Sequence, residues 1–122
     1  MKWIIEPDRP VYIQLVEQIK SKIVSGEYAA GQRIPAVREL AAEASVNPNT
    51  MQKALSELER LGLMYSQRTS GRFITEDKTL ITNLKQEIAK AQMEVFVANM
   101  KAIGFTKTEI ADLFKDMIEE DM

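Results

Sequence analysis

The sequence predicts an α+β fold that is mainly helical, with an N-terminal domain over residues 1–76 followed by a two-helix segment over residues 77–122. Apolar residues recur with the 3.6-residue period of a helix in five segments, whereas one pair of short strand-like runs flanks a turn near residue 70. The charge also changes along the chain. Residues 1–75 carry ten basic and eight acidic side chains, whereas residues 76–122 carry six and ten, so the boundary between the two parts falls near residue 76.

Three helices are predicted in the first part. Pro10 opens the first helix, which ends at Gly26 and has apolar residues at helical spacing along one face. A short second helix covers about residues 36–44 and is too short to be stable alone. The third helix covers about residues 47–61, because an asparagine that can cap a helix is followed by Pro48, a good first helical residue.

A β-hairpin is predicted after the third helix. Residues 63–67 and 72–75 are strand-like runs, and the residues between them include serine and glycine, which favour a turn. The order of elements is therefore helix, short helix, tight turn, helix and hairpin. This is the order of a winged helix-turn-helix, in which the second helix of the pair enters the major groove of DNA.

The polar face of the third helix has the composition of a DNA-reading surface. Amides and hydroxyls pair with base edges or phosphates, and a lysine neutralises a phosphate. No acidic residue interrupts this face before Glu57. The plainest alternative is a solvated helix face of mixed polar residues. The side chains that share the face are Asn49, Gln52, Lys53 and Ser56.

Arginines add to this surface on both sides of the third helix. Arg68 and Arg72 flank the small turn 69–71, which can approach a sugar-phosphate backbone or a minor groove closely. Arg38, on the second helix, can reach a phosphate or a guanine edge, or can pair with a neighbouring glutamate.

The composition excludes several kinds of site. With no cysteine and no histidine, the chain has no disulfide, no thiolate nucleophile, no imidazole base and none of the usual zinc or haem ligands. The acidic residues do not cluster at spacings that indicate a magnesium site, so we expect no cofactor, no metal and no enzymatic activity. The N-terminus lacks the apolar stretch of a signal peptide and no segment approaches a membrane span, so we expect a cytoplasmic protein without a membrane partner.

The motifs of residues 10–75 together resemble the DNA-binding domain of the GntR family of bacterial transcriptional regulators. The family's Pro-x-Tyr-x-Gln pattern corresponds to residues 10–14, and its Asn-x-x-Thr and Leu-Glu-x-x-Gly motifs correspond to residues 47–62. Its Gly-x-x-x-x-Gly-x-x-Leu-Pro-Ser-x-Arg-x-Leu-Ala run corresponds to residues 26–41, with Ala36 in place of the serine. This alanine removes a helix cap and a phosphate contact that serine would provide.

The resemblance implies DNA contacts from the second helix, from the start of the third helix and from the hairpin tip. Together with the hairpin residues described above, the expected DNA-binding set is Arg38, Asn47, Asn49, Thr50, Gln52, Lys53, Arg68, Ser70, Gly71 and Arg72.

The tail is too short for an enclosed effector cavity of ordinary size, and the chain is similar to the YtrA-type subfamily, whose two C-terminal helices form a dimer. Alternating steps of three and four residues predict a helix over 80–101 that carries the dimer seam. Methionines of this region belong to a packed core rather than to a ligand pocket. The seam residues are Ile81, Leu84, Ile88, Ala91, Val95 and Ala98.

Gly104 ends this helix, and Thr106 with Glu109 predicts a capping box for a final helix. If the seam does not lie on the 80–101 helix, we expect it on the apolar face of this final helix. That face comprises Ile110, Leu113, Phe114 and Met117.

These observations predict a dimeric repressor that binds a pseudo-palindromic DNA operator and catalyses no reaction. The resemblance further implies control of a transporter operon. The alternative is a protein-interaction module, because winged helices also bind proteins, but the non-acidic helix face and the hairpin arginines favour DNA. The operator sequence, the regulated genes and any small-molecule effector are not specified by these residues.

Overall fold

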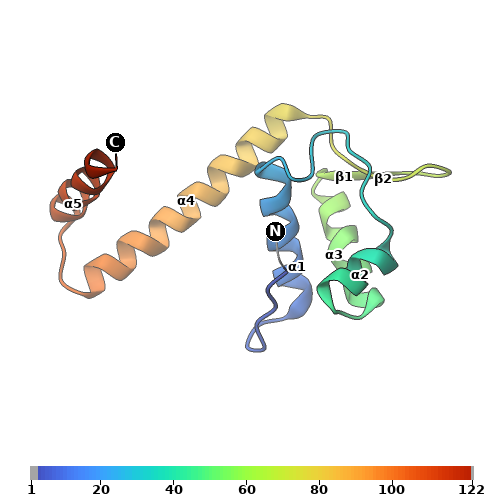
Figure 1. Cartoon of the computed structure of the whole chain (residues 1–122), viewed down its shortest axis with the longest axis horizontal. Coiled ribbons are helices and arrows are strands. Elements are labelled where there is room, and N and C mark those ends of the chain that lie inside the picture. The colour runs from blue at the N-terminus through green and yellow to red at the C-terminus, as the bar shows by residue number, and fades with distance from the viewer. Residues whose placement is uncertain (1–2, 122) are drawn as a thin grey trace. The chain divides into compact units, whose positions relative to one another are not determined.

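The computed structural model describes residues 3–121, which form five helices and one two-stranded antiparallel sheet (Figure 1). This architecture confirms the predicted mainly helical α+β class. The chain divides into two compact units, Met1–Lys85 and Gln86–Met122. The elements in order are α1 (Val11–Val24), α2 (Val37–Ala44), α3 (Pro48–Arg60), β1 (Met64–Gln67), β2 (Gly71–Ile74), α4 (Lys78–Ala102) and α5 (Lys107–Glu120).

The core of the first unit is built around α3. Both α1 and α2 pack on this helix, and β1 follows it directly. Each helix buries residues spaced three or four apart, which is one face of a 3.6-residue helix. Burial of each such large side chain contributes about 1.5–3 kcal/mol to folding. The largest fully buried side chains are Leu15, Ile19, Leu40, Met51, Leu55, Leu58 and Ile74.

A tight turn joins α2 to α3. Ser45 adopts a left-handed conformation with φ of 57°, and its N–H donates to the carbonyl of Ala42 at 3.2 Å. The next N–H, of Val46, donates to the carbonyl of Ala41 at 2.9 Å. These bonds satisfy two carbonyls at the end of α2 and reverse the chain within a few residues, so the predicted helix-turn-helix is confirmed.

The wing is an antiparallel hairpin in which Tyr65 lies opposite Phe73, with their rings stacked at 5.6 Å between centroids. Arg33, from the loop before α2, adds a single antiparallel bridge to Phe73. At the base of the hairpin Ile74 is fully buried, whereas residues 68–70 at the tip are exposed. The hairpin is therefore anchored to the core at its base, and its tip is exposed.

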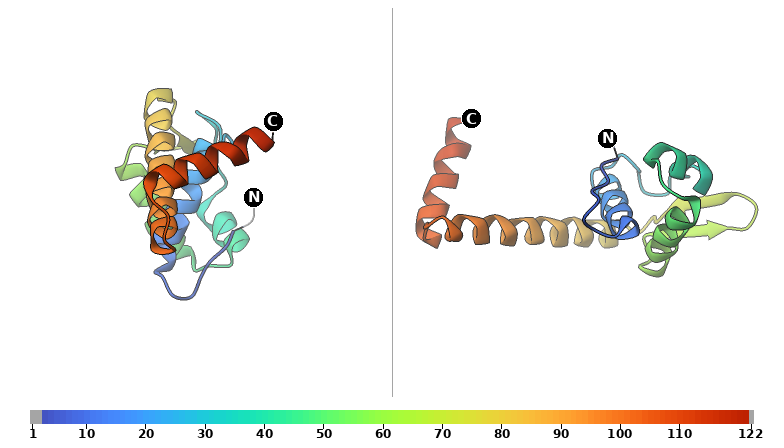
Figure 2. Two further views of the ribbon diagram at one scale, coloured as in Figure 1. Left: turned by 90° about the vertical axis from the view of Figure 1, so that its left-hand side faces the viewer. Right: turned by 90° about the horizontal axis from the view of Figure 1, so that it is seen from below.

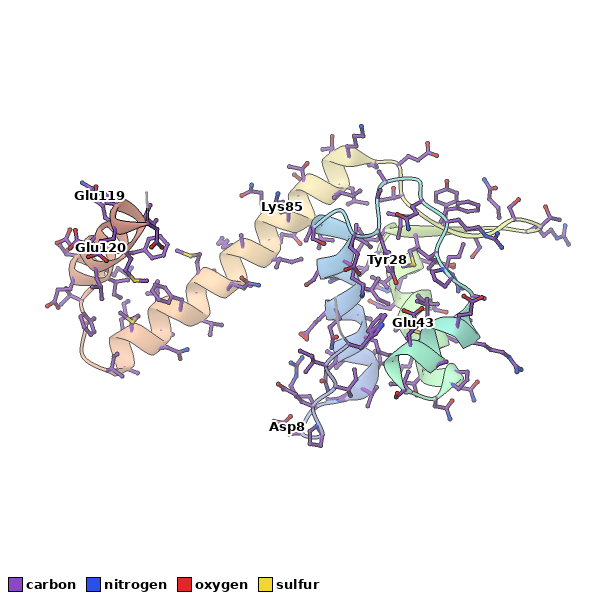
Figure 3. The ribbon with its side chains drawn as sticks, in the orientation of Figure 1. Asp8, Tyr28, Glu43, Lys85, Glu119 and Glu120 are labelled. Carbon is purple, nitrogen blue, oxygen red and sulfur yellow. The ribbon has the colours of Figure 1, made fainter. Side chains whose placement is uncertain are left out.

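A buried lysine ties the N-terminal segment to α1. The Nζ of Lys22 lies 4.7 Å from the ring centroid of Trp3, 5.4 Å from that of Tyr28, and 2.5 Å from a carboxylate oxygen of Glu27. Burial raises the pKa of Tyr28 to about 12, and the charges of Glu43 and Glu27 add to this shift. Glu43 of α2 lies close by (Figure 3). Trp3 thus belongs to the packed first unit.

Helix α4 contributes residues to both units. Asp77 caps it by accepting a hydrogen bond from the N–H of Leu80 at 3.1 Å, and the Leu80 side chain lies against Gly62. Leu84 is only 7% exposed, and the first unit ends at Lys85, part of the way along the helix (Figure 3). The division between compact units thus falls inside α4, later than the predicted boundary, because the first turns of α4 pack on the first unit.

The second unit consists of the rest of α4 and α5, which Figure 2 shows from two further directions. Gly104, with φ of 103°, ends α4. The Glu109 N–H donates to Thr106 Oγ1 at 3.2 Å, and the Thr106 N–H donates to Glu109 Oε1 at 2.9 Å. The predicted capping box is therefore confirmed. The rings of Phe96 and Phe114 lie 6.1 Å apart and hold the two helices together.

The residues predicted for the dimer seam are divided between the two units. Leu84 is buried in the core of the first unit and offers no surface to a partner, so we withdraw it from the seam. Ile81 is half-buried in the same unit. Heptad spacing identifies the apolar face of a helix but not what covers that face, which is why the sequence did not separate these two residues from the rest. The others lie in the second unit, with Ile88 half-buried and Ala91, Val95 and Ala98 exposed.

Candidate nucleic-acid interface

The N-terminal half of α3 presents a polar surface. Asn47 precedes the helix in an extended conformation, and its Oδ1 accepts a hydrogen bond from the Asn49 N–H at 2.7 Å. The predicted cap is therefore confirmed. On the opposite side of the helix, Met51 and Leu55 are fully buried, which turns the polar residues outward. The predicted residues on this surface are Asn47, Asn49, Gln52 and Lys53, which are exposed, and Thr50, which is half-buried.

Besides Asn47, two of these side chains have partners within the chain. Gln52 Nε2 donates to Ser56 Oγ at 3.1 Å, which leaves the amide oxygen of Gln52 as an open acceptor. The Nζ of Lys53 lies 3.8 Å from the ring centroid of Tyr12, at the first turn of α1. Such a cation–π contact at an exposed site is worth about 0.5–1 kcal/mol and holds the ammonium at the α1–α3 junction.

Arg38 lies in the first turn of α2. Ala36 occupies the cap position and makes no side-chain cap, as its identity predicts. The N–H groups at the start of α2 therefore have no side-chain acceptor from the cap residue, and the helix dipole there favours an anion. Arg38 is exposed, and no carboxylate lies within 4.0 Å of its guanidinium among residues 3–121. The start of α2 thus presents the unpaired positive charge of Arg38 beside the carboxylate of Glu39.

The tip of the wing carries Arg68, Ser70 and Gly71, all exposed. Gly71 has φ of 107°, a conformation that other residues rarely adopt, so the turn requires glycine at this position. The Ser70 N–H donates to the carbonyl of Gln67 at 3.2 Å and closes the turn. Arg68 has no carboxylate partner in the described part of the chain. Its charge is therefore available to a ligand.

Arg72 differs from this expectation. Its Nε lies 2.6 Å from Glu59 Oε1, and its side chain is only 17% exposed. Ser66 Oγ donates to the same oxygen at 2.5 Å. Burial raises the pKa of Glu59, but the hydrogen bonds from Ser66 and Arg72 outweigh it, so the pKa lies below its ordinary value. This ion pair braces the wing against α3, and we propose that structural role for Arg72 in place of the predicted DNA contact.

The acidic residues of α3 are both neutralised. Glu59 is held by Arg72, and Glu57 accepts from Arg60, whose Nε lies 2.9 Å from Glu57 Oε2. The carboxylates at the C-terminal end of α3 thus add little unpaired negative charge near the polar surface. The arginines of the first unit without a carboxylate within 4.0 Å, among residues 3–121, are Arg33, Arg38 and Arg68. Sequence spacing does not identify Arg33, or Tyr12 as the partner of Lys53, because both roles depend on tertiary contacts.

No helix within residues 3–121 combines the length and apolar character needed to cross a membrane. Over the same residues, no group of three or more acidic side chains is arranged to hold a metal ion.

The sequence has relatives over nearly its whole length. The HTH-type transcriptional regulator YhcF of Bacillus subtilis (strain 168) is 38% identical over 114 residues, which cover 93% of this chain and 94% of YhcF. The HTH-type transcriptional repressor YtrA of the same organism is 32% identical over 109 residues, covering 88% of this chain and 84% of YtrA. The predicted YtrA-like resemblance is confirmed.

Solved structures agree with these relatives. A GntR family transcriptional regulator from Listeria monocytogenes superposes with a TM-score of 0.83 at 40% identity, covering 91% of this chain and 97% of that chain. The DNA-binding domain of AraR in complex with operator ORX1 matches with a TM-score of 0.53 at 29% identity, covering 62% of this chain and 99% of that chain.

The family model for bacterial regulatory proteins of the gntR family matches residues 11–74, which is α1 through the wing. The matched family and these relatives are transcriptional regulators, not enzymes. Because the match includes every element of the winged helix, the chain belongs to the gntR family of bacterial regulatory proteins.

Proposed function

We propose that this chain is a dimeric, cytoplasmic repressor that binds a pseudo-palindromic DNA operator. One observation carries the proposal: the exposed start of α3 is polar and free of acidic residues, and Arg38 and Arg68 beside it lack carboxylate partners. In a helix-turn-helix, this part of the second helix contacts base edges in the major groove. The operator complex of the AraR domain and the repressor YtrA support the same use of this fold.

Each part of the surface has a role in this proposal. Gln52 and Asn49 read base edges, because amides pair with adenine and with other base donors and acceptors. Lys53, Arg38 and Arg68 contact the backbone or a guanine edge, and the wing tip approaches the sugar-phosphate chain. The similarity to YtrA-type regulators extends the proposal to control of a transporter operon.

Dimerisation is proposed to occur through the second unit. Its helices leave large apolar side chains accessible, and an open groove of about 420 Å³ between α4 and α5 is lined mainly by apolar residues such as Phe96 and Phe114. A second copy of the unit is the occupant that matches this surface, because it would cover apolar area on both partners. The exposed apolar side chains are Met93, Val95, Ile103, Leu113, Phe114, Met117 and Ile118.

The test is selection of bound duplexes from random DNA by the full chain, followed by affinity measurements over a range of salt concentrations. We expect enrichment of an inverted repeat whose half-sites lie about 10 base pairs apart, or a multiple of that spacing. The slope of log affinity against log salt is expected to be roughly −5 to −9, since each protomer neutralises several phosphates. A flat salt response without enrichment would contradict the proposal and favour the protein-interaction alternative.

A further inference from the structure

The backbone of Arg33 is fixed beside the wing. It forms the bridge to Phe73, and the residues on either side complete the pairing: the Ile74 N–H donates to the Gln32 carbonyl at 2.9 Å, and the Ile34 N–H donates to the Arg72 carbonyl at 3.0 Å. The loop thus acts as a short third strand of the wing. Alternation along this strand buries Ile34, which is 4% exposed, and turns Arg33 outward.

The side chain of Arg33 lies across Gly71. A Cβ added at Gly71 would lie 2.9 Å from Arg33 Nε, closer than unstrained packing permits, and 3.4 Å from Nη2. Glycine at this position therefore serves two purposes: it adopts φ of 107°, and it leaves space for the guanidinium. The guanidinium therefore lies beside the turn at residues 68–70, in space that a larger residue at Gly71 would fill.

The guanidinium of Arg33 has no ion-pair partner in the described residues, in contrast to the neighbouring Arg72. A guanidinium presents five N–H donors in a planar fork that matches the oxygens of a phosphate. Because Arg72 is paired with Glu59, the guanidinium of Arg33 is, with that of Arg68 at the tip, one of two beside the wing that are open to a ligand.

We infer that Arg33 is a phosphate-binding residue for duplex DNA, positioned by Gly71, and that it takes the place predicted for Arg72. The inference rests on the proposed DNA-binding function. A phosphodiester contact is independent of base sequence, so Arg33 contributes to operator and non-operator binding alike.

The experiment measures affinity of the full chain for its selected operator and for a random duplex by fluorescence anisotropy over a range of salt concentrations. Arg33→Gln is expected to weaken both complexes by about tenfold and to reduce the size of the salt slope by about 1 per protomer. Arg33→Lys, which keeps the charge, is expected to recover part of the affinity.

Arg60→Gln is the matched control, because Arg60 is an exposed arginine paired with Glu57 and its loss changes the net charge equally. We expect less than a twofold effect. Equal effects of Arg33→Gln and Arg60→Gln would overturn the inference while leaving DNA binding intact. Failure of the unchanged chain to bind duplexes in a salt-dependent manner would instead overturn the proposed function. Thermal melting of each variant identifies any loss of folding.

The role of Gly71 is tested by a double-mutant cycle. Gly71→Ala strains the turn and displaces the Arg33 side chain, so it is expected to lower affinity in the unchanged chain and much less in the Arg33→Gln background. Equal losses in both backgrounds would refute the positioning role of Gly71.

Discussion

The largest fully buried side chains, seven in number, all belong to the first unit, whereas in the second unit Val95, Ile103 and Met117 are 60%, 70% and 55% exposed. The two units therefore differ in how fully their apolar side chains are buried within a single copy of the chain. The first buries its apolar face within one protomer, as an independently folding domain does. The second has good helix caps and an aromatic contact, yet it leaves apolar surface that water contacts, which favours association with another such surface.

Removal of residues 86–122 is expected to have the largest effect on function. The fragment ending at Lys85 keeps the first turns of α4 and the buried Leu84, so it should remain folded and be monomeric. Loss of the second half-site should lower operator affinity by roughly 10²–10⁴-fold, while the weak single-site contact persists. Sedimentation and anisotropy measure the two properties. A dimeric fragment with full operator affinity would place the interface in the first unit.

Substitutions at Leu84 and Met117 are expected to have different effects, because the two residues lie in different units. Leu84→Ala creates a cavity in the first unit and should lower the free energy of unfolding by about 2–5 kcal/mol, independently of protein concentration. Met117→Glu should leave the unfolding of the first unit unchanged and weaken the dimer, because it would place an unpaired carboxylate in the interface. Chemical denaturation at several protein concentrations distinguishes these outcomes. If Leu84→Ala dissociates a dimer without lowering stability, the seam includes the start of α4.

Recognition substitutions are expected to act within the first unit alone. Arg38→Ala and Gln52→Ala should change which operator bases are tolerated, at about 1–3 kcal/mol for each lost base contact. Lys53→Ala should weaken all sequences alike, since a phosphate contact carries no sequence information. Repeating the selection with each variant tests the assignment. The roles are reversed if Lys53→Ala alters sequence preference while Arg38→Ala does not.

The two helix caps offer a smaller comparison. Asn47→Ala in the first unit and Thr106→Ala in the second each remove a helix cap and should cost about 1 kcal/mol of stability. We expect Asn47→Ala to lower DNA affinity as well, whereas Thr106→Ala should alter only stability and dimerisation. Circular dichroism melts and anisotropy measure both. If Thr106→Ala changes DNA binding while the stability of the dimer is unchanged, this separation is contradicted.

The smallest expected effect is the pH dependence at Glu59. Its folded-state pKa is below the unfolded value of about 4.3, so its contribution is present above that pH and is lost as the pH falls through the folded pKa. The partly exposed ion pair with Arg72 should contribute less than about 1 kcal/mol. In acid titrations, the free energies of unfolding of the unchanged chain and of Arg72→Gln should differ by this amount. Identical curves would show that the pair does not brace the wing.

The existence and order of the elements were predictable because their signals are local. The Asn47-Pro48 pair and the Thr106–Glu109 box lie at the helix starts that they determine, and both were found as expected. Helix α4 begins at Lys78, two residues before the predicted start at residue 80, because Asp77 caps it.

The candidate site was predictable only in part. Exposure of Gln52 and Lys53 follows from the helical period, so the sequence identified the polar face of α3. The roles of arginines depend on residues distant in the chain: Arg72 pairs with Glu59, 13 residues away, and Arg33 pairs with Phe73 across the wing. Neither contact is indicated by sequence spacing. The sequence therefore does not show which arginine near the turn braces the wing and which is open to a ligand.

The packing of Trp3 against Lys22, within the first unit, gives the two units separate optical signals. Trp3 is the chain's single tryptophan, and the tyrosines at positions 12, 28 and 65 also belong to the first unit, so intrinsic fluorescence originates there. The second unit is silent to tryptophan excitation but contributes helical circular dichroism. A melt followed by both signals in one cuvette therefore resolves whether the first and second units lose structure together or in sequence.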